Sequence, residues 1–339
     1  MKAVRKVRAM TGGPMETASP YLFVVYHKDE YPAGNSKMEH PSKVGNGMDF
    51  DQRAKYRMYH GEKVPGFPAH PHRGFETITA TIEGVIDHAD SLKNGGRYGM
   101  GDLQWMTAGS GIQHSEMFPL LHDDKPNKTR FFQIWLNLPS ASKMVPPAFE
   151  MHWAHEVRSW QSEDGKSSAT VWCGDFKGVE AFGKPPRDSY AANPASKVGI
   201  FHISIAKGGT LELDPAVGDR NLYMVEGSKS VVGGKRVERG IHAAYIETEA
   251  SVPVQIECPN SDCEFLVLQG RPIAEPVVQH GPFVMNTQQE IVETVMDYRR
   301  TQFGGWPYDR PDVVFPREKG RFAMLNGVET APPDNEILD

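Results

Sequence analysis

The sequence reads His70-Pro71-His72-Arg73-Gly74-Phe75-Glu76 at one point and Gly109-Ser110-Gly111-Ile112-Gln113-His114-Ser115-Glu116 further along the chain. Each stretch holds two metal-ligating side chains two residues apart, His70 with His72 and His114 with Glu116. On a β-strand such side chains point to the same face, roughly 6.5–7 Å apart along the strand. Two strands of this kind lying side by side can aim four ligands at one point inside a β-barrel.

Three imidazoles and one carboxylate suit a divalent first-row transition metal, and an octahedral ion held by four ligands keeps two positions open for substrate. Such a site is catalytic or redox-active rather than purely structural. Burying these four groups without a metal would be costly, because each would need its own hydrogen-bond partners. The spacing leaves the identity of the carboxylate open. Parity along the chain puts Glu76 on the same face as His70 and His72, so Glu76 competes with Glu116.

Three longer runs, residues 64–77, 101–117 and 270–287, resemble the pirin family of the cupin superfamily. The resemblance extends over residues 20–305. It implies that His70, His72, His114 and Glu116 are the metal ligands, and it leaves Glu76 a supporting role behind them. The histidine of the second motif follows Gly109 by five residues, where the general cupin pattern has three, so the ligand set adopted here is that of the pirins.

The same resemblance implies a chemistry. Pirins are similar to quercetin 2,3-dioxygenases, which open the flavonol ring with loss of carbon monoxide. We therefore expect a dioxygenase that uses Fe(II), with Mn, Ni, Cu or Zn as alternatives, and that binds a flavonol-like substrate and O₂. Glu116 is the expected general base for a phenolic proton. Residues expected to line the mouth of the site are Gln104, Trp105, Met106, Gln133 and Trp135.

Two other functions remain open. Pirins are also described as non-enzymatic iron-binding proteins whose redox state changes their affinity for a transcription factor or another protein partner. A third reading is a structural protein with two cupin barrels and a vestigial metal.

Composition excludes several classes of protein. The net charge of −6 provides no basic surface for nucleic acid. The sequence contains neither an apolar window long enough to cross a membrane nor an apolar run after the basic N-terminus that would mark a secretory signal. Three cysteines in 339 residues favour a reducing compartment, so we expect a cytoplasmic protein, or a nuclear one in a eukaryote.

The fold expected from this sequence is all-β. Glycine and proline punctuate short alternating runs, and strands are predicted at residues 21–26, 76–83 and 131–138. The strand after Glu76 is predicted to be buried on one face only. Residues 31–60 are polar and are predicted to form a long surface segment, whereas Gly95, Gly96 and Gly99 are predicted to mark turns.

A weak internal repeat predicts two tandem cupin β-barrels. The turn at Glu83-Gly84 recurs at Glu226-Gly227, and aligning the two places Leu213, Asp214 and Pro215 where the first copy has its His-x-His pair. The expected domains are a metal-binding barrel at 1–165, a barrel without ligands at 166–305 and an extended tail at 306–339. One short C-terminal helix is predicted, with Thr287 as N-cap and Glu290 completing a capping box.

Overall fold

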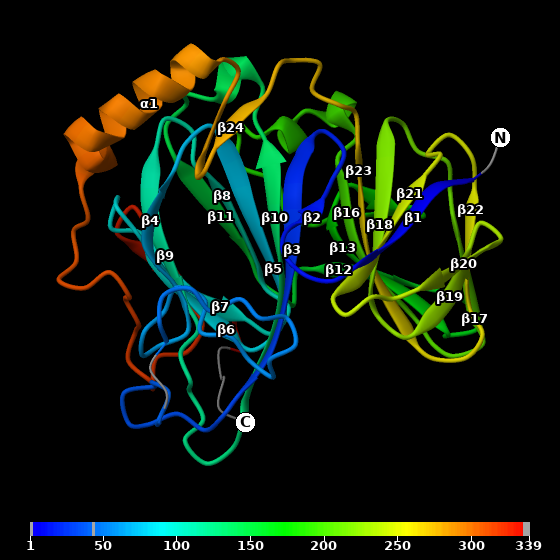
Figure 1. The fold of residues 1–339 in the computed structure, drawn as a ribbon, viewed down its shortest axis with the longest axis horizontal. Helices are drawn as coiled ribbons and strands as arrows, with labels where there is room; N and C mark the ends of the chain where they lie inside the picture. Colours follow the sequence, from blue (N-terminus) through cyan, green and yellow to red (C-terminus); the bar gives the residue numbers. More distant parts are fainter. Residues whose placement is uncertain (1–2, 43–44, 335–339) are drawn as a thin grey trace. The chain divides into compact units, whose positions relative to one another are not determined.

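The computed structural model describes residues 3–42 and 45–334, and it is built almost entirely of β-strands (Figure 1). The all-β prediction of two cupin-type barrels with a short C-terminal helix is confirmed. Residues 335–339 of the predicted tail lie outside the described residues. No helix among the described residues is long and apolar enough to cross a membrane.

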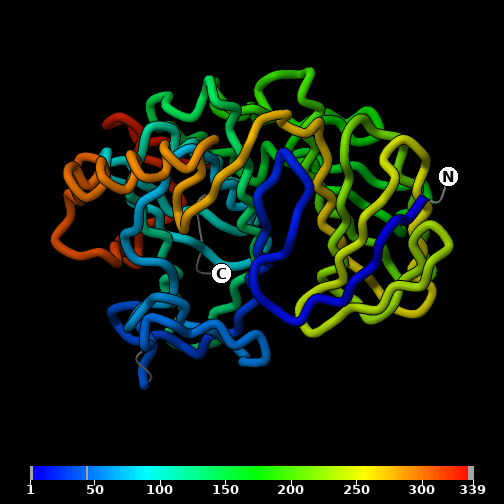
Figure 2. Tube along the Cα trace, turned by 45° about the horizontal axis from the view of Figure 1, so that its top comes forward, coloured from blue at the N-terminus to red at the C-terminus, as the bar shows by residue number. Residues whose placement is uncertain are grey.

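Two compact units divide the chain. The N-terminal unit comprises His27–Gln133, Leu138–Ala154 and Glu275–Asp339, and the C-terminal unit comprises Met1–Tyr26, Ile134–Asn137 and His155–Ala274. Strand β1 (Val4–Met10) belongs to the C-terminal unit because it pairs antiparallel with β21 (Ala243–Thr248), as the blue and yellow-green traces of Figure 2 show. The linear domain boundaries expected at residues 165 and 305 remain a prediction.

The N-terminal unit is a barrel of two facing sheets. One sheet has the order β27 (Val328–Thr330), β26 (Phe322–Leu325), β7 (Gly95–Gly99), β6 (Val85–Asp90), β9 (Ile112–Met117) and β4 (Gly66–His72). The other contains β11 (Ala148–His152), β8 (Leu103–Thr107), β5 (Phe75–Glu83) and β10 (Asn127–Asn137), followed by β3 (Tyr21–Tyr31) and β2 (Met15–Glu16). Strands β3 and β10 contain residues of both units, and β2 lies wholly within the residues of the C-terminal unit. Between the sheets lies an apolar core that includes Ile86, Tyr98, Met106, Ile112 and Phe131.

The C-terminal unit repeats this plan. Its larger sheet runs β1, β21, β18 (Asp219–Glu226), β23 (Cys263–Gly270), β16 (Gly199–Ile205), β13 (Ser167–Cys173) and β12 (Arg158–Gln161). The smaller sheet runs β17 (Gly209–Leu213), β22 (Val254–Cys258), β19 (Lys229–Val232) and β20 (Lys235–Glu238), and a hairpin joins β14 (Asp175–Phe176) to β15 (Val179–Glu180). Apolar side chains from both sheets form one core.

Helix α1 (Gln288–Thr301) begins as predicted. The Thr287 hydroxyl accepts the backbone N–H of Glu290, and the Glu290 carboxylate accepts the backbone N–H of Thr287. Ile291, Val295 and Tyr298 form an apolar stripe, which packs against the hairpin of β24 (Val278–His280) and β25 (Phe283–Met285). The remaining helical pieces are 3₁₀ turns at Ser140–Ser142, Tyr190–Ala192, Pro194–Ser196 and Gln302–Gly304.

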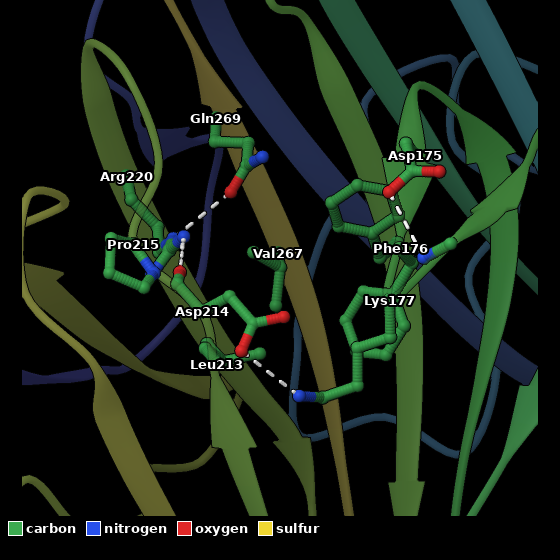
Figure 3. Close-up of a pocket in the computed structure, with 11 residues that line it drawn as sticks. Asp175, Phe176, Lys177, Leu213, Asp214, Pro215, Arg220, Val267 and Gln269 are labelled. Atoms are coloured by element: carbon green, nitrogen blue, oxygen red, sulfur yellow. Dashed lines mark hydrogen bonds and ion pairs between the residues drawn. The ribbon is translucent and has the colours of Figure 1, made fainter.

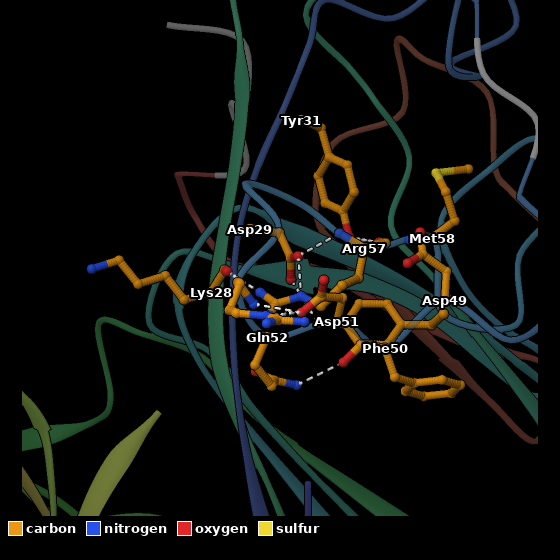
Figure 4. Close-up of polar contacts among 11 residues, drawn as sticks. Lys28, Asp29, Tyr31, Asp49, Phe50, Asp51, Gln52, Arg57 and Met58 are labelled. Atoms are coloured by element: carbon orange, nitrogen blue, oxygen red, sulfur yellow. Dashed lines mark hydrogen bonds and ion pairs between the residues drawn. The ribbon is translucent and has the colours of Figure 1, made fainter. Parts of the chain in front are cut away.

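The prediction of a surface segment at residues 31–60 holds for its middle, where no described residue of 41–56 is buried, and is wrong at both ends. Tyr31, Met38, Met58 and Tyr59 are buried, and Tyr31 and Tyr59 belong to the core of the N-terminal unit. Figure 4 shows the polar contacts that hold this segment. Its anchor is a buried ion pair in which the Arg57 Nε donates to the Asp29 carboxylate at 2.8 Å. The polar composition of this segment therefore does not reveal the buried ion pair that holds its end.

Two further local predictions are wrong. Strand β7 contains Gly95, Gly96 and Gly99, which were predicted to mark turns. A Cβ on Gly96 would lie 2.5 Å from the Phe322 carbonyl oxygen of the adjacent β26. The glycines thus permit close approach of the neighbouring strands. Strand β5 is buried on both faces over most of its length, because the Thr77, Thr79 and Thr81 face points into the barrel.

Candidate metal centre

Three imidazoles converge inside the N-terminal unit. The ring nitrogens of His70, His72 and His114 that could hold an ion all lie within 4.8 Å of one another, and these residues form the only such cluster among residues 3–42 and 45–334. His72 and His114 are buried, whereas His70 is half-buried. The three histidines that the sequence singled out therefore lie together, and their role as metal ligands stays a prediction.

Strand pairing explains the convergence. Strands β4 and β9 are antiparallel neighbours with His70 directly opposite His114, so both rings project from the same face of the sheet. His72 follows two residues later on that face. The turn after His72 is fixed by its surroundings, because a Cβ on Gly74, whose φ is +85°, would lie 2.0 Å from the Val284 carbonyl oxygen. Arg73 ties this turn to α1 by donating to the Asp297 carboxylate at 2.6 Å.

The protonation of the three rings fits a metal ligand set. Burial lowers the pKa of His70 to about 4. Burial, followed by the neighbouring imidazoles, holds the pKa values of His72 and His114 well below the usual range. All three rings are therefore neutral at pH 7 and carry a lone pair. Nδ1 of His70 lies 2.9 Å from the Pro68 carbonyl oxygen and can donate to it, which leaves Nε2 free to act as a ligand.

The spacing of the nitrogens also fits one ion. The Nε2 atoms of His70 and His114 are 3.1 Å apart. Two imidazole nitrogens bound to the same ion at about 2.1 Å lie about 3 Å from each other when they are adjacent ligands. A proton shared between the two rings would give a similar distance. The buried Nδ1 of His114 has no hydrogen-bond partner among the described residues.

Glu116 lies beside the cluster. One of its carboxylate oxygens is 3.8 Å from Nε2 of His114. The carboxylate accepts hydrogen bonds from the Thr79 hydroxyl at 3.1 Å and from the Gln133 amide at 2.6 Å, so two strands of the opposite sheet position it. Burial raises the pKa of Glu116, although His88, Thr79 and Gln133 oppose the rise. A carboxyl group with a raised pKa is a stronger base than an exposed one.

Glu76 lies away from the cluster, contrary to the parity argument. Its carboxylate accepts a hydrogen bond from the Thr107 hydroxyl at 2.6 Å and so joins β5 to β8. The turn at Arg73-Gly74 separates Glu76 from the strand that carries His70 and His72, so parity does not carry across it. Glu76 therefore supports the barrel wall, which is the role that the pirin resemblance implied.

His88 is a residue of this region that the sequence patterns did not single out. It is fully buried and lies opposite Glu116 in the ladder between β6 and β9, with its ring 5.4 Å from that of His114. The signal was present, since His88 and Asp90 have the same two-residue spacing as the ligand pairs. His60, by contrast, is exposed.

The residues expected to line the mouth divide between the two faces of their strands. Gln133 contacts Glu116, and Gln104 is the ladder partner of Thr79, so both occupy the interior face. Met106 is part of the apolar core, and Trp105 is its fully buried neighbour on the opposite face of β8. Trp135 belongs to the C-terminal unit.

Comparison with known families agrees with this geometry. The family model described as Pirin matches residues 31–136, and the Pirin C-terminal cupin domain matches residues 200–304. The two matches cover the site-bearing strands of the N-terminal unit and most of the second barrel.

Individual relatives give the same result. A Pseudomonas aeruginosa protein named "Putative quercetin 2,3-dioxygenase" is 36% identical over 238 residues, which is 70% of this chain and 79% of the relative. Human Pirin is 34% identical over 254 residues, or 73% of this chain and 80% of the relative. A crystal structure of quercetin 2,3-dioxygenase from Acinetobacter baumannii superposes with a TM-score of 0.69 at 26% identity, covering 90% of this chain and 96% of that one. The chain therefore belongs to the pirin family.

Proposed function

We propose that this protein is an iron-dependent dioxygenase that opens the central ring of a flavonol such as quercetin and releases carbon monoxide. The observation that carries the proposal is the convergence of three neutral imidazoles beside a buried carboxylate inside a barrel. The relatives and the solved structure named as quercetin 2,3-dioxygenases support the same chemistry.

His70, His72, His114 and Glu116 are the proposed metal ligands. A bound iron ion would polarise the adjacent oxygens of the flavonol as a Lewis acid and exchange electrons with substrate and O₂. Imidazole and carboxylate ligands also bind Mn, Ni, Cu or Zn, and each of these ions can be chelated by two oxygens of the substrate.

Glu116 has a second proposed role, as the base that takes the proton of the 3-hydroxyl. Its raised pKa favours proton uptake at neutral pH. Gln133 and Thr79 hold the carboxylate in place from the opposite sheet, so the base is positioned before substrate arrives. The apolar core around Met106, Tyr98 and Ile112 excludes water from the interior.

The test is O₂ uptake by protein loaded separately with Fe(II), Mn, Ni, Cu or Zn. The substrates are a panel of flavonols and, for each, the matching flavone that lacks the 3-hydroxyl. The proposal predicts uptake with flavonols and none with the flavones, because the flavone loses both the chelating oxygen and the proton that Glu116 accepts.

The alternative of a non-catalytic iron protein that regulates a protein partner remains a prediction. Failure of every metal form to consume O₂ with any flavonol would remove the enzymatic proposal and leave that alternative.

A further inference from the structure

The second barrel has its own cavity in the place where the first barrel has its metal site. Counting back from Glu226-Gly227, as from Glu83-Gly84 in the first copy, brings Leu213 and Pro215 to the positions of His70 and His72. In the structure both residues line a pocket of about 340 Å³ in the C-terminal unit (Figure 3). At these positions the second barrel has a pocket and no histidines.

The floor of this pocket is apolar. Phe176, Phe201, Leu213 and Val267 line it, and all four belong to the hydrophobic core of the C-terminal unit. The rings of Phe176 and Phe201 meet edge to face with centroids 5.2 Å apart. Such a surface favours a flat apolar body.

A buried arginine side chain, Arg220, lines the wall of the pocket. Arg220 is only 3% exposed, and it shares a face of β18 with Leu222 and Met224, which lie in the core. Its guanidinium donates from Nε to the Gln269 side-chain oxygen at 3.0 Å and from Nη2 to the Asp214 backbone carbonyl. Both acceptors are neutral.

The third nitrogen of Arg220 is unsatisfied. Nη1 is buried and has no hydrogen-bond partner, and Arg220 forms no ion pair, within the part of the chain that the structure describes. Burial lowers the pKa of Arg220 to about 10, so it is still protonated at neutral pH. The Asp214 carboxylate opposes this fall in the pKa of Arg220 but accepts no hydrogen bond from its guanidinium, so Nη1 remains unsatisfied. A ligand carboxylate that accepts from Nη1 would remove the cost of burying it.

The other charges around the pocket limit the ligand to a single negative charge. Lys177 donates to the Asp214 carboxylate at 3.2 Å, so this pair is largely neutralised. The exposed carboxylate of Asp175 remains at the rim and repels a dianion. The volume lies at the lower end of the range for small-molecule pockets, about 300–1,000 Å³, which suits a single ring.

We infer that the pocket of the second barrel binds a small aromatic monocarboxylate, with the carboxylate on Arg220 and the ring against Phe176 and Phe201. This inference is independent of the proposed dioxygenase activity, because no residue of the metal centre takes part.

The test is titration of the full-length protein with benzoate by calorimetry, with benzamide and inorganic phosphate as comparison ligands. Benzoate is expected to bind and the other two are not, because benzamide lacks the charge and phosphate lacks the ring. Arg220→Gln should weaken benzoate binding about tenfold or more, the usual scale for losing a charge-assisted hydrogen bond. Arg236→Gln is the matched control, since Arg236 is exposed on β20 of the same barrel, and it should bind like wild type.

Two further measurements keep the inference testable. His114→Ala should bind benzoate like wild type, which separates this pocket from a carboxylate bound at the metal centre. In case Arg220→Gln does not fold, NMR of the wild-type protein should show intermolecular contacts between benzoate and the rings of Phe176 and Phe201. The inference is overturned by absent benzoate binding, by equal binding of benzamide or phosphate, by loss of binding in His114→Ala, or by contacts elsewhere.

Discussion

Glu116 lies directly opposite His88 in the antiparallel ladder between β9 and β6, so the carboxylate of the proposed centre has a fully buried imidazole as its neighbour. Neither ring nitrogen of His88 has a hydrogen-bond partner among the described residues. His88 also lies outside the cluster of three histidines. Because the proposed ligand set is complete without His88, we predict that His88 belongs to the wall of the site and does not bind the metal.

Replacement of His88 by phenylalanine should therefore leave the metal content unchanged. Each unsatisfied buried polar atom costs about 1–3 kcal/mol, so His88→Phe should unfold at an equal or higher urea concentration than wild type. Elemental analysis and urea unfolding of the two proteins check this. Loss of the metal in His88→Phe would instead make His88 a ligand.

Glu116→Gln should lose most of its turnover and only part of its metal. The amide oxygen can still coordinate weakly, but it cannot accept the phenolic proton, and loss of a positioned base costs about 10²-fold or more in rate. Glu76→Gln is the matched change on the barrel wall. Its amide oxygen can still accept from Thr107, so metal content and rate should stay close to wild type.

Initial rates and metal stoichiometry of the two glutamine variants, measured side by side, decide between the carboxylates. A rate like wild type in Glu116→Gln, or the larger loss in Glu76→Gln, would contradict the assignment.

Asp29→Ala should destabilise the N-terminal unit by about 3–5 kcal/mol, because it leaves the guanidinium of Arg57 buried without a counterion. Tyr59 would also lose the carboxylate to which its hydroxyl donates at 2.7 Å. Chemical unfolding measures the change. Glu30→Ala removes the neighbouring but exposed pair with Lys55 and should cost at most about 1 kcal/mol. Equal effects of the two changes would show that the pair of Asp29 and Arg57 contributes no more than a surface contact.

Lys143 should make the free energy of unfolding depend on pH in the alkaline range. Its ammonium group is buried and donates to the carbonyl oxygens of Gly74 and Val284, and burial lowers its pKa from 10.5 to about 8. Between these two values the folded state has lost a proton that the unfolded state keeps. The free energy of unfolding therefore rises with pH over this window, by at most about 1.4 kcal/mol per pH unit.

The measurement compares wild type with Lys143→Met, because other groups titrate in both proteins. The stability of wild type relative to the variant should increase from pH 8 to 10.5. A constant difference across this range would show that the lysine keeps an ordinary pKa.

Much of the site could be predicted from sequence because it depends on short-range periodicity. Two-residue spacing within β4 and within β9 fixes which side chains share a face, and the capping box of Thr287 and Glu290 is a purely local signal. The two-residue alternation could not predict the face of the sheet on which Glu76 lies, because the turn at Gly74 interrupts the strand.

The remaining errors concern contacts between distant segments. The glycines of β7 are explained by β26, which is far away in sequence and pairs with that strand. The polar segment at 31–60 is held by the pairing of Arg57 with Asp29 on β3. The periodicity within either segment does not reveal such partners. Composition alone therefore predicted turns where the structure has β7, and surface at the two ends of the segment 31–60, where the structure has buried residues.

The central claim is that the three-histidine centre with Glu116 performs flavonol ring opening. It is tested most directly by the carbon monoxide released per quercetin consumed, measured on protein with a known metal content. We expect about one equivalent of iron per chain, one carbon monoxide for each quercetin, and loss of both metal and carbon monoxide in His114→Ala, which should fold like wild type because the sheet packing rather than the ion holds the barrel together. Carbon monoxide release that persists in the metal-free His114→Ala protein, or none from the wild-type protein with its iron in place, would contradict the account.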